Sequence, residues 1–207
     1  MAENGSALGN KRVSLPPLGM TQVTRVVRDL GVTVDVTGAR LVLSTATSGG
    51  ALSAYASVID NVTNDPRTLL PKAAPISYDR PFRWYLPFSA RAGGAFYTTD
   101  VTVANVGTTT ANYFLKFLGN NRDGSVGPQR NYSLPAGRSA TFADVLKSVF
   151  NLDSDFGAIQ VGGSEDLVVL GQTSTPGFGG TFGQSVPAME QQDLMLRETA
   201  FHCGRSG

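Results

Sequence analysis

The chain has 207 residues, of which 16% are charged, and its formal net charge is +1. A net charge near zero without basic runs gives no indication of a nucleic-acid-binding surface. No apolar run reaches the roughly 18 residues of a membrane span. The first ten residues are polar, so we expect no signal peptide in this chain. Low charge combined with 24 glycines and 11 prolines predicts a mainly β fold.

An internal repeat organises the chain. Ser14-Leu15-Pro16 recurs 119 residues later as Ser133-Leu134-Pro135. A stripe of apolar side chains with helical spacing follows each copy, and it consists of Val23, Val26, Val27 and Leu30 in the first and Phe142, Val145, Leu146 and Val149 in the second. The stripes predict a short helix of two to three turns in each copy. We expect strands over 39–43 and 52–59 after the first helix, and over 158–161 and 167–173 after the second.

The stretch from about residue 80 to 130 occurs only once. Alternating apolar residues predict strands over 97–105 and 111–118, with a further strand over 129–134. The Gly-rich run 177–183 lacks the Gly-Lys-Ser/Thr ending of a phosphate loop and predicts a hairpin turn. We therefore divide the chain into the back half of a first repeat (1–79), a complete β-sandwich repeat (80–188) and a stub of a third repeat or a tail (189–207). Such a division predicts a fragment of a longer repeat protein.

Three short motifs resemble a known class of module. They are Phe96-Tyr97-Thr98-Thr99-Asp100-Val101, Asp144-Val145-Leu146, and Gly180-Thr181-Phe182-Gly183-Gln184 followed by Val186-Pro187. The chain resembles the immunoglobulin-like β-sandwich repeats of bacterial extracellular proteins. This resemblance implies immunoglobulin-like sandwich repeats with one short helix each, in a secreted or cell-surface parent protein. It supplies no set of catalytic residues.

Catalytic and metal chemistry has few candidate residues. His202 is the only histidine, so a hydrolytic triad would need it, although its place in a terminal tail favours a loose segment. The single cysteine, Cys203, excludes an intrachain disulfide, and zinc would require His202 from several subunits around an oligomer axis. Calcium has candidate ligands in Asp60 with Asp65 and in Asp153 with Asp155, but capping of turns is the more common use of such residues.

An aromatic stretch is the best candidate for ligand binding. We expect Trp84, Tyr85 and Phe88 to form a platform that stacks on sugars or anchors a protein, with Arg80 and Arg83 adding polar contacts. The alternative is that these aromatic residues fill the core of the sandwich, where strands commonly place them.

The incomplete first repeat predicts exposed apolar surface and unpaired strand edges, so we expect a homo-oligomer formed through it. The function that the sequence favours is a structural or adhesive repeat of a secreted or cell-surface bacterial protein, binding glycan or protein. The alternative is a hydrolase, with or without a metal such as zinc or calcium, whose site forms around His202 at an oligomer interface.

Overall fold

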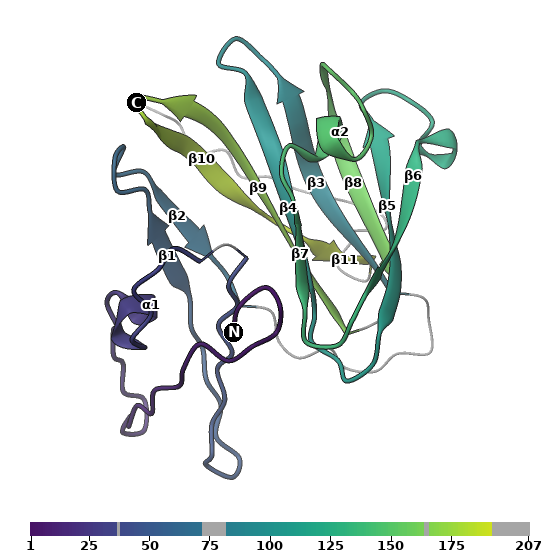
Figure 1. The fold of residues 1–207 in the computed structure, drawn as a ribbon. Coiled ribbons are helices and arrows are strands. Elements are labelled where there is room, and N and C mark those ends of the chain that lie inside the picture. The colour runs from purple at the N-terminus through teal and green to yellow at the C-terminus, as the bar shows by residue number, and fades with distance from the viewer. Residues whose placement is uncertain (37, 72–81, 164–165, 192–207) are drawn as a thin grey trace.

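The computed structural model describes residues 1–36, 38–71, 82–163 and 166–191. The fold is mainly β and antiparallel, which confirms the predicted class (Figure 1). None of the helices in the described part of the chain has the length and apolar character needed to span a bilayer.

Most strands belong to one module between residues 82 and 190. They are β3 (Phe82–Ala92), β4 (Tyr97–Asn105), β5 (Ala111–Gly119), β6 (Gln129–Leu134), β7 (Ser139–Phe142), β8 (Asp155–Gly163), β9 (Leu167–Gly177), β10 (Gly180–Pro187) and β11 (Met189–Glu190). Two short helices interrupt them, η1 (Gly124–Val126) and α2 (Val145–Ser148). The strands predicted over 97–105 and 129–134 are confirmed at both ends, and the Gly-rich run forms the predicted β9–β10 hairpin.

The nine strands form one sheet that turns at a corner. β3 and β4 pair only through Arg91 with Thr98 and Ala92 with Tyr97. On one side of this corner the strand order is β7-β4-β9-β10, and on the other it is β11-β3-β8-β5-β6. The two halves of the sheet thus enclose one core.

The core takes alternate residues from strands on both sides of the corner, because successive side chains of a strand point to opposite faces. Val101 and Val103 from β4 lie in one cluster with Leu115 from β5 and Val161 from β8. The helix α2 adds Val145 and Leu146, both completely buried, so its apolar side closes one end of the module (Figure 1).

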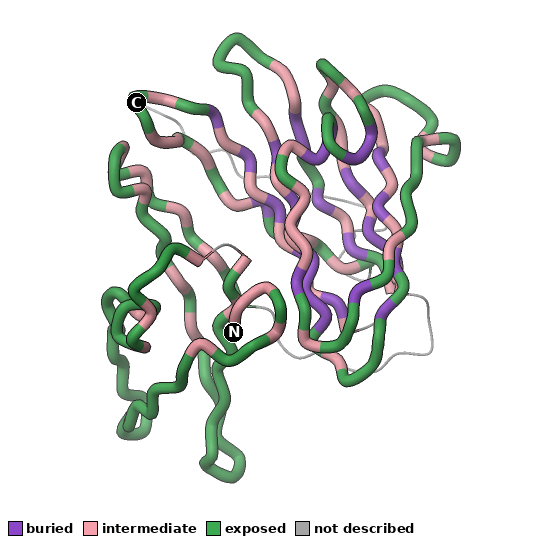
Figure 2. Tube along the Cα trace, in the orientation of Figure 1, coloured by how far each residue is buried: buried purple, intermediate pink, exposed green. Residues whose placement is uncertain are grey.

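Residues 1–71 have a different character. They form α1 (Val26–Asp29) and a two-stranded hairpin of β1 (Ala56–Ile59) and β2 (Pro66–Leu69). None of their described residues is buried, whereas buried residues run through the strands of the module (Figure 2).

The predicted length of both helices and the predicted strands of the first repeat are wrong. Each helix is a single turn rather than two to three turns. Residues 39–43 form no strand, and the strand expected over 52–59 is reduced to 56–59. A strand needs a hydrogen-bonded neighbour along its length, and within the described part of the chain residues 39–43 have backbone hydrogen bonds only between Arg40 and Met1 and belong to no sheet.

Candidate ligand-binding cleft

The structure separates the residues of the predicted aromatic platform. Trp84 is 1% exposed and packs in the core beside Leu86, so it is not available to a ligand. Arg83 and Tyr85 alternate with it and lie on the opposite, outer face of β3. Phe88 is exposed and lines a different hollow from Arg83. Arg80 is outside the described residues. The prediction that these side chains form one platform is therefore wrong for Trp84, because the pleat of β3 turns it inward.

A bulge in β3 sets the direction of Phe88. The pairing of β3 with β8 shifts register between Leu86 and Ser89, at the Pro87-Phe88 step. Proline donates no ladder hydrogen bond, which makes this a natural place for the irregularity. Ser89 is fully buried and donates from its hydroxyl to the carbonyl of Gly157 at 3.0 Å, which anchors the strand after the bulge. Phe88 is left pointing out of the core.

Phe88 lines a cleft beside the β3–β4 corner. The cleft has a volume of about 420 Å³, and its other lining residues are Tyr97, Thr173, Phe182, Gly183 and Gln184. Phe88 and Tyr97 are each 40% exposed and Phe182 is 38% exposed. We call this site the aromatic cleft. It combines a residue of β3 with residues of β4, β9 and β10, so it forms only when the sheet has turned its corner.

The floor of the aromatic cleft is polar. The hydroxyls of Thr173 and Thr99 are 2.8 Å apart, and the Thr99 hydroxyl also accepts a hydrogen bond of 2.9 Å from the backbone N–H of Ala90. Both threonines are buried. The amide of Gln184, opposite Thr173 in the β9–β10 register, is exposed at the rim. The cleft thus offers aromatic rings together with an amide that can both donate and accept hydrogen bonds.

The β1–β2 hairpin supports the wall that β10 gives to the cleft. A carboxylate oxygen of Asp60 accepts from the backbone N–H and the hydroxyl of Thr181, at 3.0 and 3.1 Å. Asp65 accepts from the N–H of Gly183 at 2.8 Å. These backbone groups point away from β9, so the two carboxylates cap the free edge of β10. Backbone hydrogen bonds from Thr63 and Val62 hold the pKa of Asp60 well below its ordinary value.

These contacts also bear on the predicted metal ligands. Asp60 and Asp65 cap backbone donors, while Asp153 pairs with Lys147 at 2.6 Å and Asp155 with Arg122 at 2.8 Å. The described residues contain no group of three or more histidine, cysteine or acidic side chains that could hold a metal ion. His202, the predicted catalytic and zinc-binding residue, lies outside the described residues, as does Cys203, so the hydrolase remains a prediction.

A second hollow, of about 630 Å³, lies on the outer face of the sheet. Arg83, Gly162, Phe114 and Asn131 are neighbours in register across β3, β8, β5 and β6. The ring of Phe114 lies over Gly162, where an added Cβ would stand 2.3 Å from the ring. The lining also includes Phe82, Tyr113 and Tyr132, but Tyr113 is buried and the other two pack against the core, so Phe114 is the ring that the outer face of β5 presents to this hollow.

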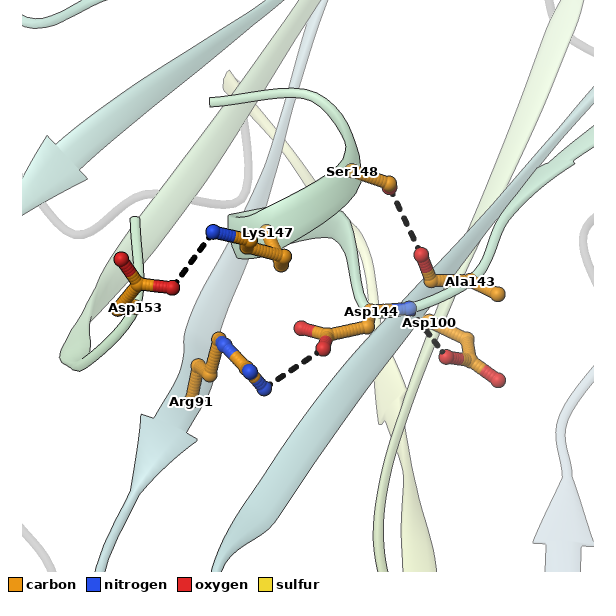
Figure 3. Close-up of polar contacts among 7 residues, drawn as sticks. All are labelled: Arg91, Asp100, Ala143, Asp144, Lys147, Ser148 and Asp153. Atoms are coloured by element: carbon orange, nitrogen blue, oxygen red, sulfur yellow. Dashed lines mark hydrogen bonds and ion pairs between the residues drawn. The ribbon is translucent and has the colours of Figure 1, made fainter. Parts of the chain in front are cut away.

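A charged cluster fixes α2 on the module (Figure 3). Arg91 of β3 forms a 2.7 Å ion pair with Asp144, the residue before α2. The backbone N–H of Asp144 donates to the Asp100 carboxylate of β4 at 2.8 Å. Asp144 has a φ of 43°, a left-handed conformation that is uncommon for a residue with a side chain. The cluster thus holds a strained turn that carries Val145 and Leu146 into the core.

Comparison with known proteins adds little. No family model matches the chain, and a search of curated proteins finds no match. Among solved structures, the crystal structure of Thermotoga maritima 1070 matches with 12% identity over 54% of this chain and 96% of that one, at a TM-score of 0.42. A likeness this remote carries no argument about function.

Sequence reasoning identified part of the aromatic cleft. It selected Phe88, but it named Phe182 and Gln184 only within a motif and missed them, together with Thr173, as ligand-facing residues. The signal that could have found them is the β9–β10 hairpin itself, because its turn fixes Gln184 opposite Thr173.

Proposed function

We propose that the chain is a structural and adhesive β-sandwich repeat, of immunoglobulin-like kind, from a secreted or cell-surface bacterial protein, and that it binds glycan in the aromatic cleft. The convergence of Phe88, Tyr97 and Phe182 around one hollow carries the proposal. Aromatic rings stack against the apolar faces of sugars, while amide and hydroxyl groups bind the sugar hydroxyls.

Three features favour this site over the outer-face hollow. The three aromatic side chains of the cleft are more exposed than any aromatic residue lining the other hollow, and the β3 bulge turns one of them outward. Its walls come from rigid strands rather than loops, so the rings are held before a ligand arrives and little ordering is needed on binding. The Asp60 and Asp65 contacts fix the position of β10, which otherwise has a free edge.

Retention of the purified chain on a panel of insoluble polysaccharides (cellulose, chitin, xylan and peptidoglycan) tests the proposal. We expect retention on at least one of them, and a loss of affinity of about ten-fold for Phe88→Ala and for Tyr97→Ala, because each removes a stacking surface. Both side chains are partly exposed, so neither variant should unfold the module.

Phe114→Ala is the matched control, since it removes an aromatic ring from the other hollow and should leave retention unchanged. Loss of retention in Phe114→Ala alone would move the site to the outer face. Absence of retention on every polysaccharide would contradict glycan binding and leave the structural role.

A further inference from the structure

The helix and the hairpin of residues 10–71 repeat those of residues 129–187. The helices α1 and α2 both have four residues and lie 119 positions apart, and each is preceded by a left-handed residue, Arg25 or Asp144. The hairpins match as well, 116 positions apart: Ala56 pairs with Leu69 as Gln172 pairs with Ser185. We call residues 10–71 and 129–187 the two back halves, and residues 82–119, which comprise β3, β4 and β5, the front half.

The two back halves differ in the segments that need front-half strands. β6 pairs with β5, β7 pairs with β4, and β8 pairs with β3 and β5. The segments at the equivalent positions of the first back half, 10–15, 20–23 and 38–44, form no strand. Only the helix and the hairpin, which close through local hydrogen bonds, are present there. The backbone of Met1 pairs with Arg40 alone in these segments, so what the first back half lacks is partner strands along their length.

The apolar side chains of the first back half confirm that a surface is uncovered. Val42 is 63% exposed, whereas Val161 at the equivalent position is completely buried. Val27 is likewise exposed where Leu146 is buried. The front half covers this surface in the complete module, since β3, β4 and β5 supply much of the core around Val161 and Leu146.

A second copy of the chain cannot supply the cover by exchanging strands. The described residues of each chain contain two back halves and one front half, so an exchange of described strands between identical chains leaves one back half per chain without partners. The occupant is therefore a front-half segment other than residues 82–119 of this chain.

The charge of Arg25 places a further requirement on this front-half segment. In the complete module Arg91 of the front half binds Asp144 of the back half at 2.7 Å. Arg25 stands at the position of Asp144 in the first back half. A front half like this one would place its Arg91 against Arg25, and like charges in such a contact repel.

We propose that residues 10–71 form a docking surface for a front-half segment of the same repeat type, with three strands equivalent to β3, β4 and β5 and with aspartate or glutamate at the position of Arg91. The strands would add to the backbone edges of 38–44 and 20–23 by β-augmentation, and their apolar faces would cover Val27 and Val42. This inference stands apart from glycan binding, because it concerns neither the aromatic cleft nor its ligand.

A grafted front half tests the proposal in the full chain. Residues 82–119 are placed directly before Met1, which restores the 119-residue spacing and gives the graft a high effective concentration. Two versions are compared, one with Arg91 in the graft and one with Arg91→Glu in the graft. Hydrogen exchange is measured at 20–23 and 38–44.

We expect the Arg91→Glu graft to slow exchange at 38–44 by about ten-fold or more relative to the ungrafted chain, and the unchanged graft to slow it less. Combining the unchanged graft with Arg25→Asp should restore the protection, because this reverses the charge on the other side. A graft with Val101→Asp and Val103→Asp is the control, since charged β4 residues cannot cover the apolar surface; it should give no protection.

Three results would overturn the proposal. If no graft protects 38–44, residues 10–71 are not a docking surface for front-half strands. If the graft with Arg91 and the graft with Arg91→Glu protect 38–44 equally, the docking segment does not need an acidic residue at this position. Protection of 38–44 in the ungrafted chain identifies a different occupant, a second copy if it rises with protein concentration and another segment of the same chain if it does not.

Discussion

The two halves of this molecule contain the same local elements in different surroundings. α1 and α2 match in length and in the left-handed residue that precedes them, and the β1–β2 hairpin has the register of β9–β10. Yet Val161 is buried and Val42 is exposed. The comparison teaches that the apolar pattern determines which face a segment would bury, while the presence of partner strands determines whether it becomes a strand at all.

The largest difference between the two regions should appear on truncation of the helix side chains. Leu146→Ala should destabilise the module by about 2–5 kcal/mol, because it leaves a cavity in a closed core. Val27→Ala, at the equivalent position, should change the free energy of unfolding by no more than about 0.5 kcal/mol, because Val27 is exposed. Denaturant titration of both variants measures the contrast, and similar losses would show that the N-terminal region has a core of its own.

Removing a polar contact should also destabilise the module more than the matching change destabilises the N-terminal region, but the difference in unfolding free energy should be smaller. Thr99→Val should cost about 1–3 kcal/mol, because it leaves the N–H of Ala90 without its acceptor in a buried place. Ser57→Val is the control in the exposed β1 strand and should be close to neutral. If the stability of Thr99→Val equals that of the unchanged chain, the threonine pair does not hold the floor of the cleft.

The smallest effect concerns the contact between the two regions. The pKa of Asp60 is lowered in the folded chain, so its carboxylate stabilises this contact fully above the ordinary pKa of 3.8. That stabilisation is lost as the pH falls from 3.8 toward the lowered pKa. We expect the Thr181 amide, corrected for the intrinsic pH dependence of exchange, to lose protection as the pH is lowered through this range. Asp60→Ala should show low protection at every pH, and a pH profile shared by both proteins would assign the change to other groups.

The sequence predicts the module well and the N-terminal region poorly. Val101 and Val103 alternate cleanly along β4, and Tyr113, Leu115 and Phe117 do so along β5, because one face of each strand meets the core. Residues 39–43 show an equally apolar pattern, but pattern alone cannot tell whether a pairing partner exists. The helices are shorter than predicted because each is followed by a turn, at Leu30-Gly31 and at Val149-Phe150.

The candidate site could be predicted only in part for a related reason. The aromatic composition of residues 82–97 indicates a binding surface, but strand parity divides it, so that Trp84 enters the core while Arg83 and Tyr85 face outward. The exposure of Phe88 depends on a bulge, and its neighbour Phe182 comes from a strand almost a hundred residues away. Contacts of this kind arise from the corner between β3 and β4 and leave no local signal in the sequence.

Hydrogen exchange on the unmodified chain tests the central claim most directly, by comparing two equivalent segments in one sample. We expect strong protection of residues 157–163 in β8 and nearly unprotected exchange of residues 38–44 at the equivalent positions, except at Arg40, whose N–H donates to the carbonyl of Met1. Comparable protection of both segments, at a concentration where light scattering shows a single chain, would contradict it, because the first back half would then have found partner strands within the same molecule.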